Sequence, residues 1–378
     1  MSKVPCPDRD LLSRSTLRLG IIGTGMMGCE HIRNVMALDG AEVTSISDPH
    51  RPSLEAALLT LGDHAAPRIH SDHRELLDAG DLDGVIVASP NHTHVDVLRD
   101  VLDSDVPCLV EKPLCTTVAD CLEVVDAAVR RSAITWVGLE YRYMAPVQAL
   151  LDVVRSGRLG PLKMLAIREH RFPFLVKVDN WNRFTRNTGG TLVEKCCHFF
   201  DLMNQAVGSR PHRVFASGGQ DVNHLDEIYD GERSDILDNA YVIVEYDNGV
   251  RASLDLCMFA EAGRHEQEIV AVGSLGKAET RLPNGDGVVV GRRSDRSLEV
   301  VPTPMDASVG YEGFHWGASF IEVARFCDAI RSGSSPEVGV LDGLWSVAVG
   351  EAAHRSIDSG LPVRIDTLHP RLAELRTR

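Results

Sequence analysis

The stretch Leu17-Arg18-Leu19-Gly20-Ile21-Ile22-Gly23-Thr24-Gly25-Met26-Met27-Gly28 decides the fold of this chain. An apolar run ends in the glycine pattern G-x-G-x-x-G, and apolar residues at helical spacing follow it. A strand, a glycine-rich turn and a helix in this order are the context that a dinucleotide-binding fingerprint requires. Gly23 allows the tight turn, Gly25 lets the backbone approach a pyrophosphate, and Gly28 lets the helix pack on the strand. The helix N-terminus would supply positive charge for the phosphates.

A second strand, at 43–46, leads to Asp48, twenty residues beyond Gly28. An acidic side chain at this spacing binds the adenosine ribose hydroxyls in such folds. Its charge would repel the 2′-phosphate of NADP, so we predict NAD, although Arg51 nearby would suit that phosphate. The residues of this region that we expect to bind NAD are Gly23, Gly25, Met26, Met27, Gly28 and Asp48.

Strand and helix patterns continue to alternate as far as residue 137. Six strands interleaved with helices predict an α/β domain with a parallel, doubly wound sheet. Beyond the two strands already named, strands are expected at 84–88, 108–110 and 134–137, and helices at 53–61, 95–102 and 118–129.

After Tyr143 consecutive strand patterns are joined by turns, with Asn248-Gly249 as the strongest hairpin signal. We therefore predict a second domain of α+β type with an antiparallel or mixed sheet. Its strands are expected at 162–167, 214–217, 241–246, 251–258, 268–272 and 362–365, and helices at 146–156, 191–206, 314–331 and 344–356. The predicted plan is a tail at 1–16, a dinucleotide-binding domain at 17–140, a substrate domain at 141–366 and a tail at 367–378.

The composition excludes several classes of protein. A formal net charge of −15 argues against nucleic acid as a partner, because phosphates require a basic footprint. No apolar run approaches the ~20 residues that span a bilayer, and residues 1–16 lack the apolar core of a secretory signal. The 9 cysteines show no repeated C-x-x-C pattern, so we expect free thiols, a reducing cytoplasm and no bound metal.

Two further motifs follow strands at the edge where open α/β sheets bind ligands. The turn Ser89, Pro90, Asn91 with His94 is expected to lie along the cofactor, while Asn91 could also cap the next helix. Glu111 and Lys112 follow the fifth strand and are expected to contact the cofactor as well. A lysine there would also favour the alkoxide form of a substrate hydroxyl.

Residues 189–201 set an acid, a base and an imidazole on one short segment. If the segment is helical from Thr191 onward, Glu194 and His198 share a face, with Lys195 beside them. Such a cluster can serve catalysis. The alternative is an ordinary surface histidine with Glu194 as its i, i+4 partner, and a solvent-facing Lys195.

Residues 163–195 are basic against the acidic background of the chain. A local basic patch suggests an anionic ligand, unless the counter-ions lie elsewhere in the fold. Trp181 would offer an aromatic platform for a sugar ring, or fill the core under a long loop. The residues that we expect to bind substrate are Tyr141, Arg168, Arg171, Lys177, Trp181 and Lys195.

These motifs stand in the order and spacing of the Gfo/Idh/MocA oxidoreductases, which the chain resembles from about Leu17 to Ile365. The resemblance rests on the fingerprint, Ser89-Pro90-Asn91 with His94, Glu111-Lys112-Pro113, the segment from Gly189-Gly190 to His198, and the closing stretch from Phe320 to Gly360. It implies a Rossmann domain, a C-terminal α/β domain with an open, mostly antiparallel sheet, NAD(P), and oligomers packed through that sheet.

The resemblance also implies the catalytic residues Lys112, His198 and Glu194. Lys112 would contact the reacting hydroxyl, and His198 would be the acid/base. Glu194 stands where the family commonly has Asp, so its role as substrate ligand or histidine orienter is a point to test. Lys195 and the Cys196-Cys197 pair also depart from the family's glycine-rich version.

We therefore expect an NAD-dependent oxidoreductase, a homodimer or homotetramer, acting on a secondary ring hydroxyl of a sugar or cyclitol. The basic segment points to an anionic hexopyranoside. One alternative is a redox-neutral glycoside hydrolase like the superfamily's NAD-dependent sulfoquinovosidases, which oxidise C3 transiently, eliminate the C1 group, add water and reduce the ketone again. It would release an anionic sugar such as sulfoquinovose. A second alternative is a non-catalytic NAD-sensing protein, although the presence of Lys112 and His198 speaks against it.

Overall fold

The computed structural model describes residues 16–64, 66–283 and 287–376, so most of the predicted N-terminal tail and the last two residues lie outside it. The chain folds into two compact units. The first takes in residues 16–114, 123–138 and 308–340, and the second takes in 115–122, 139–307 and 341–376. The predicted domain bounds differ from these units at 115–122, 139–140 and 308–340. Segment 308–340 joins the first unit because its helix α10 (Ala318–Ser332) packs against α1 (Met26–Met36).

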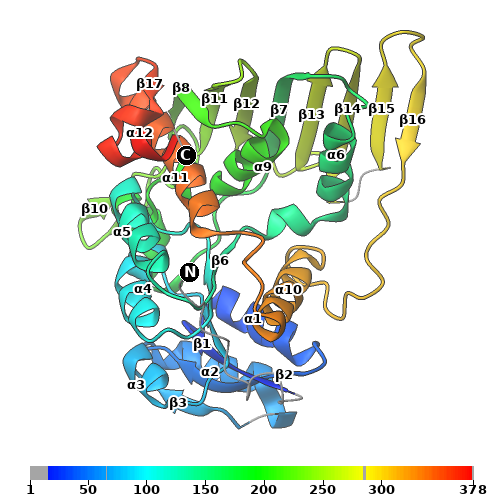
Figure 1. Ribbon diagram of the computed structural model, residues 1–378. Coiled ribbons are helices and arrows are strands. Elements are labelled where there is room, and N and C mark those ends of the chain that lie inside the picture. The colour runs from blue at the N-terminus through cyan, green and yellow to red at the C-terminus, as the bar shows by residue number, and fades with distance from the viewer. Residues whose placement is uncertain (1–15, 65, 284–286, 377–378) are drawn as a thin grey trace. The chain divides into compact units, whose positions relative to one another are not determined.

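The first unit is built on a six-stranded parallel sheet (Figure 1). Its strands are β1 (Leu17–Ile22), β2 (Ala41–Ser47), β3 (Arg68–His70), β4 (Gly84–Val87), β5 (Cys108–Glu111) and β6 (Thr135–Gly138). The order β3-β2-β1-β4-β5-β6 reverses direction between β1 and β4, as in doubly wound dinucleotide-binding folds. The predicted α/β class and parallel sheet are confirmed.

Four helices of this fold lie where helices were predicted, namely α1, α2 (Arg51–Leu61), α4 (His94–Asp103) and α5 (Val118–Ala128). Helix α3 (His73–Asp78) was not predicted. Strands β4 and β5 are buried along their whole length, which is why they read as unbroken apolar runs. Among the described residues, no helix is long and apolar enough to cross a membrane.

The second unit is built on a nine-stranded sheet of order β16-β15-β14-β13-β7-β12-β11-β8-β17. Its strands are β7 (Leu162–His170), β8 (Pro211–Gly219), β11 (Asn239–Tyr246), β12 (Arg251–Cys257), β13 (Gln267–Gly273), β14 (Gly276–Leu282), β15 (Val288–Arg292), β16 (Leu298–Val301) and β17 (Val363–Arg364). Strands β7 and β12 run parallel, and the other neighbouring pairs run antiparallel. A separate small hairpin pairs β9 (Ile228–Tyr229) with β10 (Glu232–Arg233). The prediction of a mostly antiparallel sheet is confirmed.

Helices cover one face of this sheet and leave the other open. Helices α6 (Ala145–Arg155) and α9 (Cys197–Val207) lie on the covered face, against β14 and β7 (Figure 1). Side chains alternate between faces along a strand, so Leu165 and Ile167 are buried on β7 while Met164 is exposed. On β11 the exposed positions are Tyr241 and Ile243. The open face therefore carries apolar side chains.

Two expectations of secondary structure differ from the fold. The helix expected at 191–206 is two helices, α8 (Thr191–Glu194) and α9, separated by Lys195 and Cys196. The stretch expected to be a C-terminal tail contains helix α12 (Pro370–Arg376), which buries Leu372 completely. The remaining helices of this unit are η4 (Glu140–Tyr143), η5 (Val178–Arg183), α7 (Thr185–Thr188), α11 (Val340–Ser359) and η6 (Ile365–Thr367).

Candidate active site

The loop between β1 and α1 needs glycine at two of its three fingerprint positions. Gly23 has a φ of +87°, and a Cβ there would lie 2.5 Å from the backbone nitrogen of Ser89. A Cβ on Gly28 would lie 2.1 Å from the Gly23 carbonyl oxygen. Around Gly25 nothing described lies within 4 Å of the place a Cβ would take, which leaves room for a ligand. Met26-Met27 form the first turn of α1, and no side chain caps this turn, so its backbone N–H groups can bind phosphate oxygens.

Asp48 lies beside this loop, just after β2. Its carboxylate accepts hydrogen bonds from the backbone N–H of Thr24 (2.7 Å) and of His50 (2.8 Å). These bonds hold the carboxylate at the carboxyl end of the strand, where the fold binds ribose. Each carboxylate oxygen accepts more than one hydrogen bond, so capacity remains for ribose hydroxyls.

One buried imidazole ties the turn after β4 to the turn after β5. His94 Nδ1 lies 2.9 Å from the Pro113 carbonyl oxygen, and Nε2 lies 3.0 Å from that of Ser89. Burial lowers the pKa of His94 in spite of these carbonyls. His94 was predicted to contact the cofactor, and its contacts show that it positions two of the predicted cofactor loops.

Asn91 follows Pro90 in the first of these turns and does not cap α4, whose N-cap residue is Thr93. Asn91 is buried, and its Nδ2 has no hydrogen-bond partner among the described residues. A buried donor without an acceptor is destabilising, and a cofactor oxygen would satisfy it. The open space at Gly25, the uncapped helix and this amide together fit a bound dinucleotide.

Glu111 and Lys112 end β5, and a histidine from α1 holds the glutamate. His31 Nε2 lies 2.7 Å from Glu111 Oε1, and both side chains are buried. Burial alone would raise the pKa of Glu111, but the hydrogen bond and charge of His31, with the charge of Lys112, lower it below its ordinary value. The Lys112 backbone N–H donates to Oε2 of the same carboxylate (3.2 Å). Glu111 thus anchors the backbone that carries Lys112, with the help of a histidine that was not predicted.

In the second unit, Gly189 and Gly190 begin the segment that carries the acid/base residues. Both have positive φ, 77° and 85°. A Cβ on Gly189 would lie 2.4 Å from the Thr116 carbonyl oxygen, and a Cβ on Gly190 would lie 2.2 Å from His354 Nε2. The same nitrogen of His354 accepts a hydrogen bond from the Leu192 backbone N–H (3.1 Å). Burial lowers the pKa of His354 to about 4, so the ring stays neutral and able to accept near pH 7.

The break between α8 and α9 removes the spacing argument for Glu194. Cys196 has φ −85° and ψ −5°, so the regular i, i+4 geometry is not kept from Glu194 to His198. Glu194 is buried at the end of α8. Its assignment as a catalytic residue therefore rests on the family resemblance and stays a prediction.

His198 is buried, and its neighbours come from η4. Its Nε2 lies 3.5 Å from Oε1 of Glu140, which is also buried. The ring of Tyr141 stacks on the imidazole, with centroids 4.1 Å apart and an interplanar angle of 11°. A carboxylate thus lies at the edge of the ring, and an aromatic ring covers one of its faces.

Lys195 is buried as well, and a carboxylate inside the protein balances its charge. Its Nζ lies 3.1 Å from Glu169 Oε1 and donates a hydrogen bond to the Tyr141 hydroxyl (2.8 Å). Gln267 Nε2 donates to the same hydroxyl (3.2 Å) and to the same carboxylate oxygen (3.2 Å). Lys195 is therefore not a solvent-facing charge.

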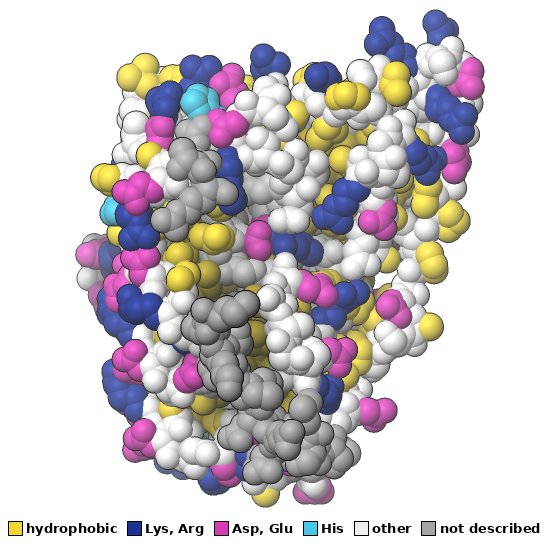
Figure 2. Space-filling view, in the orientation of Figure 1, with side chains coloured by type: hydrophobic (Ala, Val, Ile, Leu, Met, Phe, Trp, Pro, Cys, Tyr) yellow, Lys and Arg dark blue, Asp and Glu magenta, His cyan; other side chains and the backbone are white. Residues whose placement is uncertain are grey.

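The four arginines of the basic segment also pair with acidic residues. The ion pairs are Arg168–Glu268 (3.1 Å), Arg171–Glu169 (3.7 Å), Arg183–Glu227 (2.8 Å) and Arg186–Glu232 (2.6 Å). On the face that Figure 2 shows, Lys and Arg side chains are likewise interspersed with Asp and Glu. For Arg168, Arg183 and Arg186 the counter-ions come from elsewhere in the fold, as the alternative interpretation of this segment expected, while Arg171 and Lys195 share Glu169 of the segment itself.

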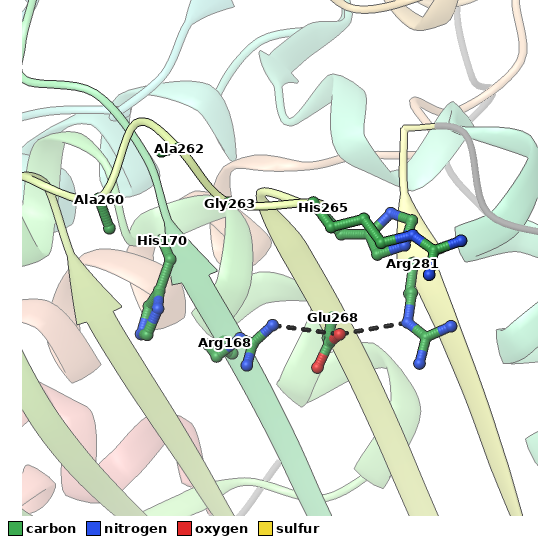
Figure 3. Close-up of a pocket in the computed structure, with 9 residues that line it drawn as sticks. Arg168, His170, Ala260, Ala262, Gly263, His265, Glu268 and Arg281 are labelled. Carbon is green, nitrogen blue, oxygen red and sulfur yellow. Dashed lines mark hydrogen bonds and ion pairs between the residues drawn. The ribbon is translucent and has the colours of Figure 1, made fainter.

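Arg168 lies on the other face of the sheet from Lys195. Because side chains alternate along β7, Glu169 is buried toward the helices and Arg168 points to the open face. There Arg168 and Arg281 both pair with Glu268, each at 3.1 Å, beside an open cavity of about 580 Å³ (Figure 3). The fold does not bring Arg168 to the other predicted substrate residues.

Arg171, another predicted substrate residue, follows β7 and forms an ion pair with Glu169. Lys177 and Trp181 lie half-buried farther along, and the Trp181 carbonyl accepts a hydrogen bond from Asn187 Nδ2 (2.9 Å). Tyr141 and Lys195 are thus the predicted substrate residues that meet around His198.

Three members of this buried group were not predicted, namely Glu140, Glu169 and Gln267. Glu169 carries a signal in the sequence, because it takes an inward position of β7 two residues after Ile167, where an acid needs a partner. Glu140 and Gln267 carry none, because their contacts come from distant parts of the chain.

Comparison with known proteins gives the same arrangement of two domains. Residues 17–139 match the NAD-binding Rossmann-fold domain of the Gfo/Idh/MocA oxidoreductases, and residues 152–365 match that family's C-terminal α/β domain. The chain is 25% identical over 352 residues to the myo-inositol 2-dehydrogenase of Thermotoga maritima, covering 93% of this chain and 99% of that one. It is 26% identical over 358 residues to inositol 2-dehydrogenase 1 of Saccharopolyspora erythraea, covering 93% and 97%.

Solved structures share the fold. Levoglucosan dehydrogenase in complex with NADH matches with a TM-score of 0.80 at 21% identity, covering 93% of this chain and 99% of that one. An oxidoreductase from Agrobacterium radiobacter, in complex with NAD+, L-tartaric acid and magnesium, matches with a TM-score of 0.79 at 19% identity and the same coverage. With both family domains matched and a loop that fits a dinucleotide, the chain belongs to the Gfo/Idh/MocA family of oxidoreductases and is an NAD-dependent enzyme.

Proposed function

We propose that this enzyme oxidises a secondary ring hydroxyl of a sugar or cyclitol. The observation that carries the proposal is the buried group of ionisable side chains around His198. Oxidation of an alcohol requires a base for the hydroxyl proton, and a histidine held by a carboxylate and an aromatic ring suits that task. The inositol dehydrogenases among the relatives support this class of substrate.

Lys112 and His198 divide the proton chemistry in this proposal. Lys112 donates a hydrogen bond to the substrate oxygen and stabilises the negative charge that develops there. His198 accepts the proton. NAD, when bound by the fingerprint loop, Asp48 and Asn91, supplies the hydride acceptor. Glu194 is proposed as a ligand of the substrate hydroxyls.

Unsatisfied polar atoms favour a substrate rich in hydroxyls. Oε2 of Glu169, Oε1 of Gln267 and Nε of Arg171 are buried without a hydrogen-bond partner among the described residues. Two acceptors and one donor suit hydroxyl groups, which both donate and accept. Trp181 and Lys177 are proposed to contact the sugar ring from their loop.

The predicted anionic substituent has partial support. Lys195 and Arg171 share the single carboxylate of Glu169, so that carboxylate matches one of their two charges, whereas Arg168 faces the open side of the sheet. The inositol dehydrogenases among the relatives make a neutral ring the first substrate to test. An anionic hexopyranoside is the competing candidate substrate.

The redox-neutral glycoside hydrolase is the second candidate, and one contact favours it. The Tyr141 hydroxyl accepts hydrogen bonds from Lys195 and Gln267, which hold it in place as a further polar group beside His198. Elimination of a C1 substituent needs such a group in addition to His198. The non-catalytic alternative leaves these buried charges without a purpose.

The test incubates the full chain with NAD and a panel of neutral inositols and sugars, carboxylated and sulfonated sugars, and their aryl glycosides. We expect NADH to accumulate in step with loss of a neutral polyol. Release of aglycone over many turnovers without accumulation of NADH would show that the enzyme is the glycoside hydrolase and not the dehydrogenase. Preference for a sulfonated or carboxylated sugar would support an anionic substrate instead of a neutral one. No reaction with any member would favour the NAD-sensing protein.

Two further properties are proposed with this function. The exposed apolar side chains Met164, Tyr241 and Ile243 on the open sheet face support a homodimer or homotetramer. The 8 cysteines among the described residues have free thiols, which supports a reducing cytoplasm.

A further inference from the structure

We propose that Glu140 and Lys195 are positioning residues that set the protonation of His198 in opposite directions. Glu140 stabilises the imidazolium form, while Lys195, acting through Tyr141, disfavours it. The inference rests on the proposed role of His198 as the acid/base residue. It assigns the orienting carboxylate to Glu140, a residue of η4, instead of Glu194.

Glu140 acts directly, because its carboxylate oxygen lies 3.5 Å from His198 Nε2. Both side chains are about 2% exposed, so little water screens the interaction. An opposite charge within about 4–6 Å moves the protonation of a group by one or more pH units toward its charged form. Glu140 therefore makes His198 a better proton acceptor.

Lys195 acts on His198 indirectly, through Tyr141. Its ammonium group donates to the Tyr141 hydroxyl at 2.8 Å and lies 5.0 Å from the centroid of the Tyr141 ring. That ring is stacked 4.1 Å from the imidazole. A cation at the hydroxyl of the stacked ring opposes protonation of His198, but more weakly than Glu140 favours it, because Glu169 pairs with Lys195 at 3.1 Å.

The other charged groups around His198 come from several elements. On η4, Arg142 donates to Asp201 of α9 at 2.6 Å and also pairs with Asp342 of α11 at 3.1 Å, so this group has one carboxylate more than it has cations. On α8, Glu194 lies close along the chain and adds negative charge of the same sign as Glu140. On β7, Glu169 pairs with both Lys195 and Arg171, so its single charge does not cancel both cations. The opposing pair is thus Glu140 and Lys195.

The experiment follows the protonation of His198 itself, by NMR of full-length protein labelled at histidine Cε1. The His198 signal is assigned by its loss in His198→Asn. We expect Glu140→Gln to lower the midpoint of its titration by about one pH unit, since a neighbouring opposite charge has that effect. Lys195→Met should raise the midpoint by a smaller amount. Glu299→Gln on β16 and the exposed Lys163→Met make the same chemical changes elsewhere and should leave the midpoint unchanged.

Shifts of opposite sign support the proposal, because a loss of packing alone would not produce them. Unchanged midpoints, or shifts of the same sign, would overturn it. Lys195→Met leaves Glu169 buried without its lysine, so Lys195→Met with Glu169→Gln is the second variant that guards against misfolding. The acidic limb of the kcat profile should move in the same directions as the midpoints. If the midpoints move as expected but no sugar or cyclitol reduces NAD, the proposed function fails and the inference stands.

Discussion

Lys112 is the residue whose loss should separate cofactor binding from chemistry. It follows β5 on a backbone that Glu111 and His31 hold. Replacing Lys112 with Met keeps much of its length and removes the charge that would stabilise an alkoxide. We expect kcat to fall by about 10²–10⁴-fold, the usual range for such groups, with NAD affinity nearly unchanged.

The measurement pairs NADH formation with a calorimetric titration of NAD. Lys163→Met, an exposed lysine on β7, is the matched control and should keep full activity. Turnover by Lys112→Met at the wild-type rate would remove Lys112 from the mechanism.

His354 should make the stability of the protein depend on pH. Its pKa is about 4 in the folded state against an ordinary value of 6.5, so the unfolded chain binds a proton that the folded chain excludes. Stability is therefore full above pH 6.5 and is lost as the pH falls toward 4, by roughly 3 kcal/mol in total. Urea unfolding at pH 7.5 and 4.5 measures this loss. It should be smaller in His354→Gln, and an equal loss in both proteins would contradict the assignment.

At the scale of helices and strands, the sequence was most informative where neighbouring residues alone determine the element. The fingerprint predicted β1 to its last residue because strand, turn and helix are local there. Of the six expected strands, β3 was not placed, since it is three residues long and mostly exposed at the sheet edge. The break at Lys195 was also missed, because a helix pattern does not reveal that a charged residue is buried against another element.

The candidate site also contains residues that local sequence predicts and residues that depend on distant contacts. The positions of Gly23, Asp48 and Lys112 just after strands could be predicted, because each follows a local apolar run, and this is the edge where α/β folds bind ligands. Glu140, Glu169 and Gln267 could not be predicted together, since their contacts depend on the register of β7 with β13 and on where η4 meets α9. Lys195 was noticed, but its partner was not, and so its charge was taken for a substrate signal.

The turn that begins α8 offers a prediction at the scale of an element. Gly190→Ala would place a Cβ 2.2 Å from the His354 ring at a φ of +85°. Strain and overpacking together should destabilise the protein by about 2–4 kcal/mol and displace the segment that carries His198. Gly249→Ala is the matched control, with a φ of +82° and nothing described within 4 Å, and should cost about 1 kcal/mol. Equal thermal shifts for the two variants would mean that the contact with His354 is unimportant.

At the scale of the whole molecule, the open face of the nine-stranded sheet is the feature that a single chain does not explain. Tyr241 and Ile243 on β11 and Met164 on β7 are exposed there, while the residues between them along each strand are buried. The same face also carries the ion pairs of Arg168 and Arg281 with Glu268, so apolar and charged side chains are mixed on it. Exposed apolar side chains grouped on one face favour association, and the same face on a second copy of the chain would cover them.

We therefore expect the protein to be a homodimer or homotetramer that depends on this face. Ile243→Asp introduces a charge that would have to be desolvated in the interface, so light scattering after size exclusion should show a smaller assembly. Ile69→Asp, an equally exposed isoleucine on β3 of the first unit, should leave the assembly unchanged. A wild-type protein that is monomeric at micromolar concentration, or an assembly that Ile69→Asp dissociates and Ile243→Asp does not, would place the interface elsewhere.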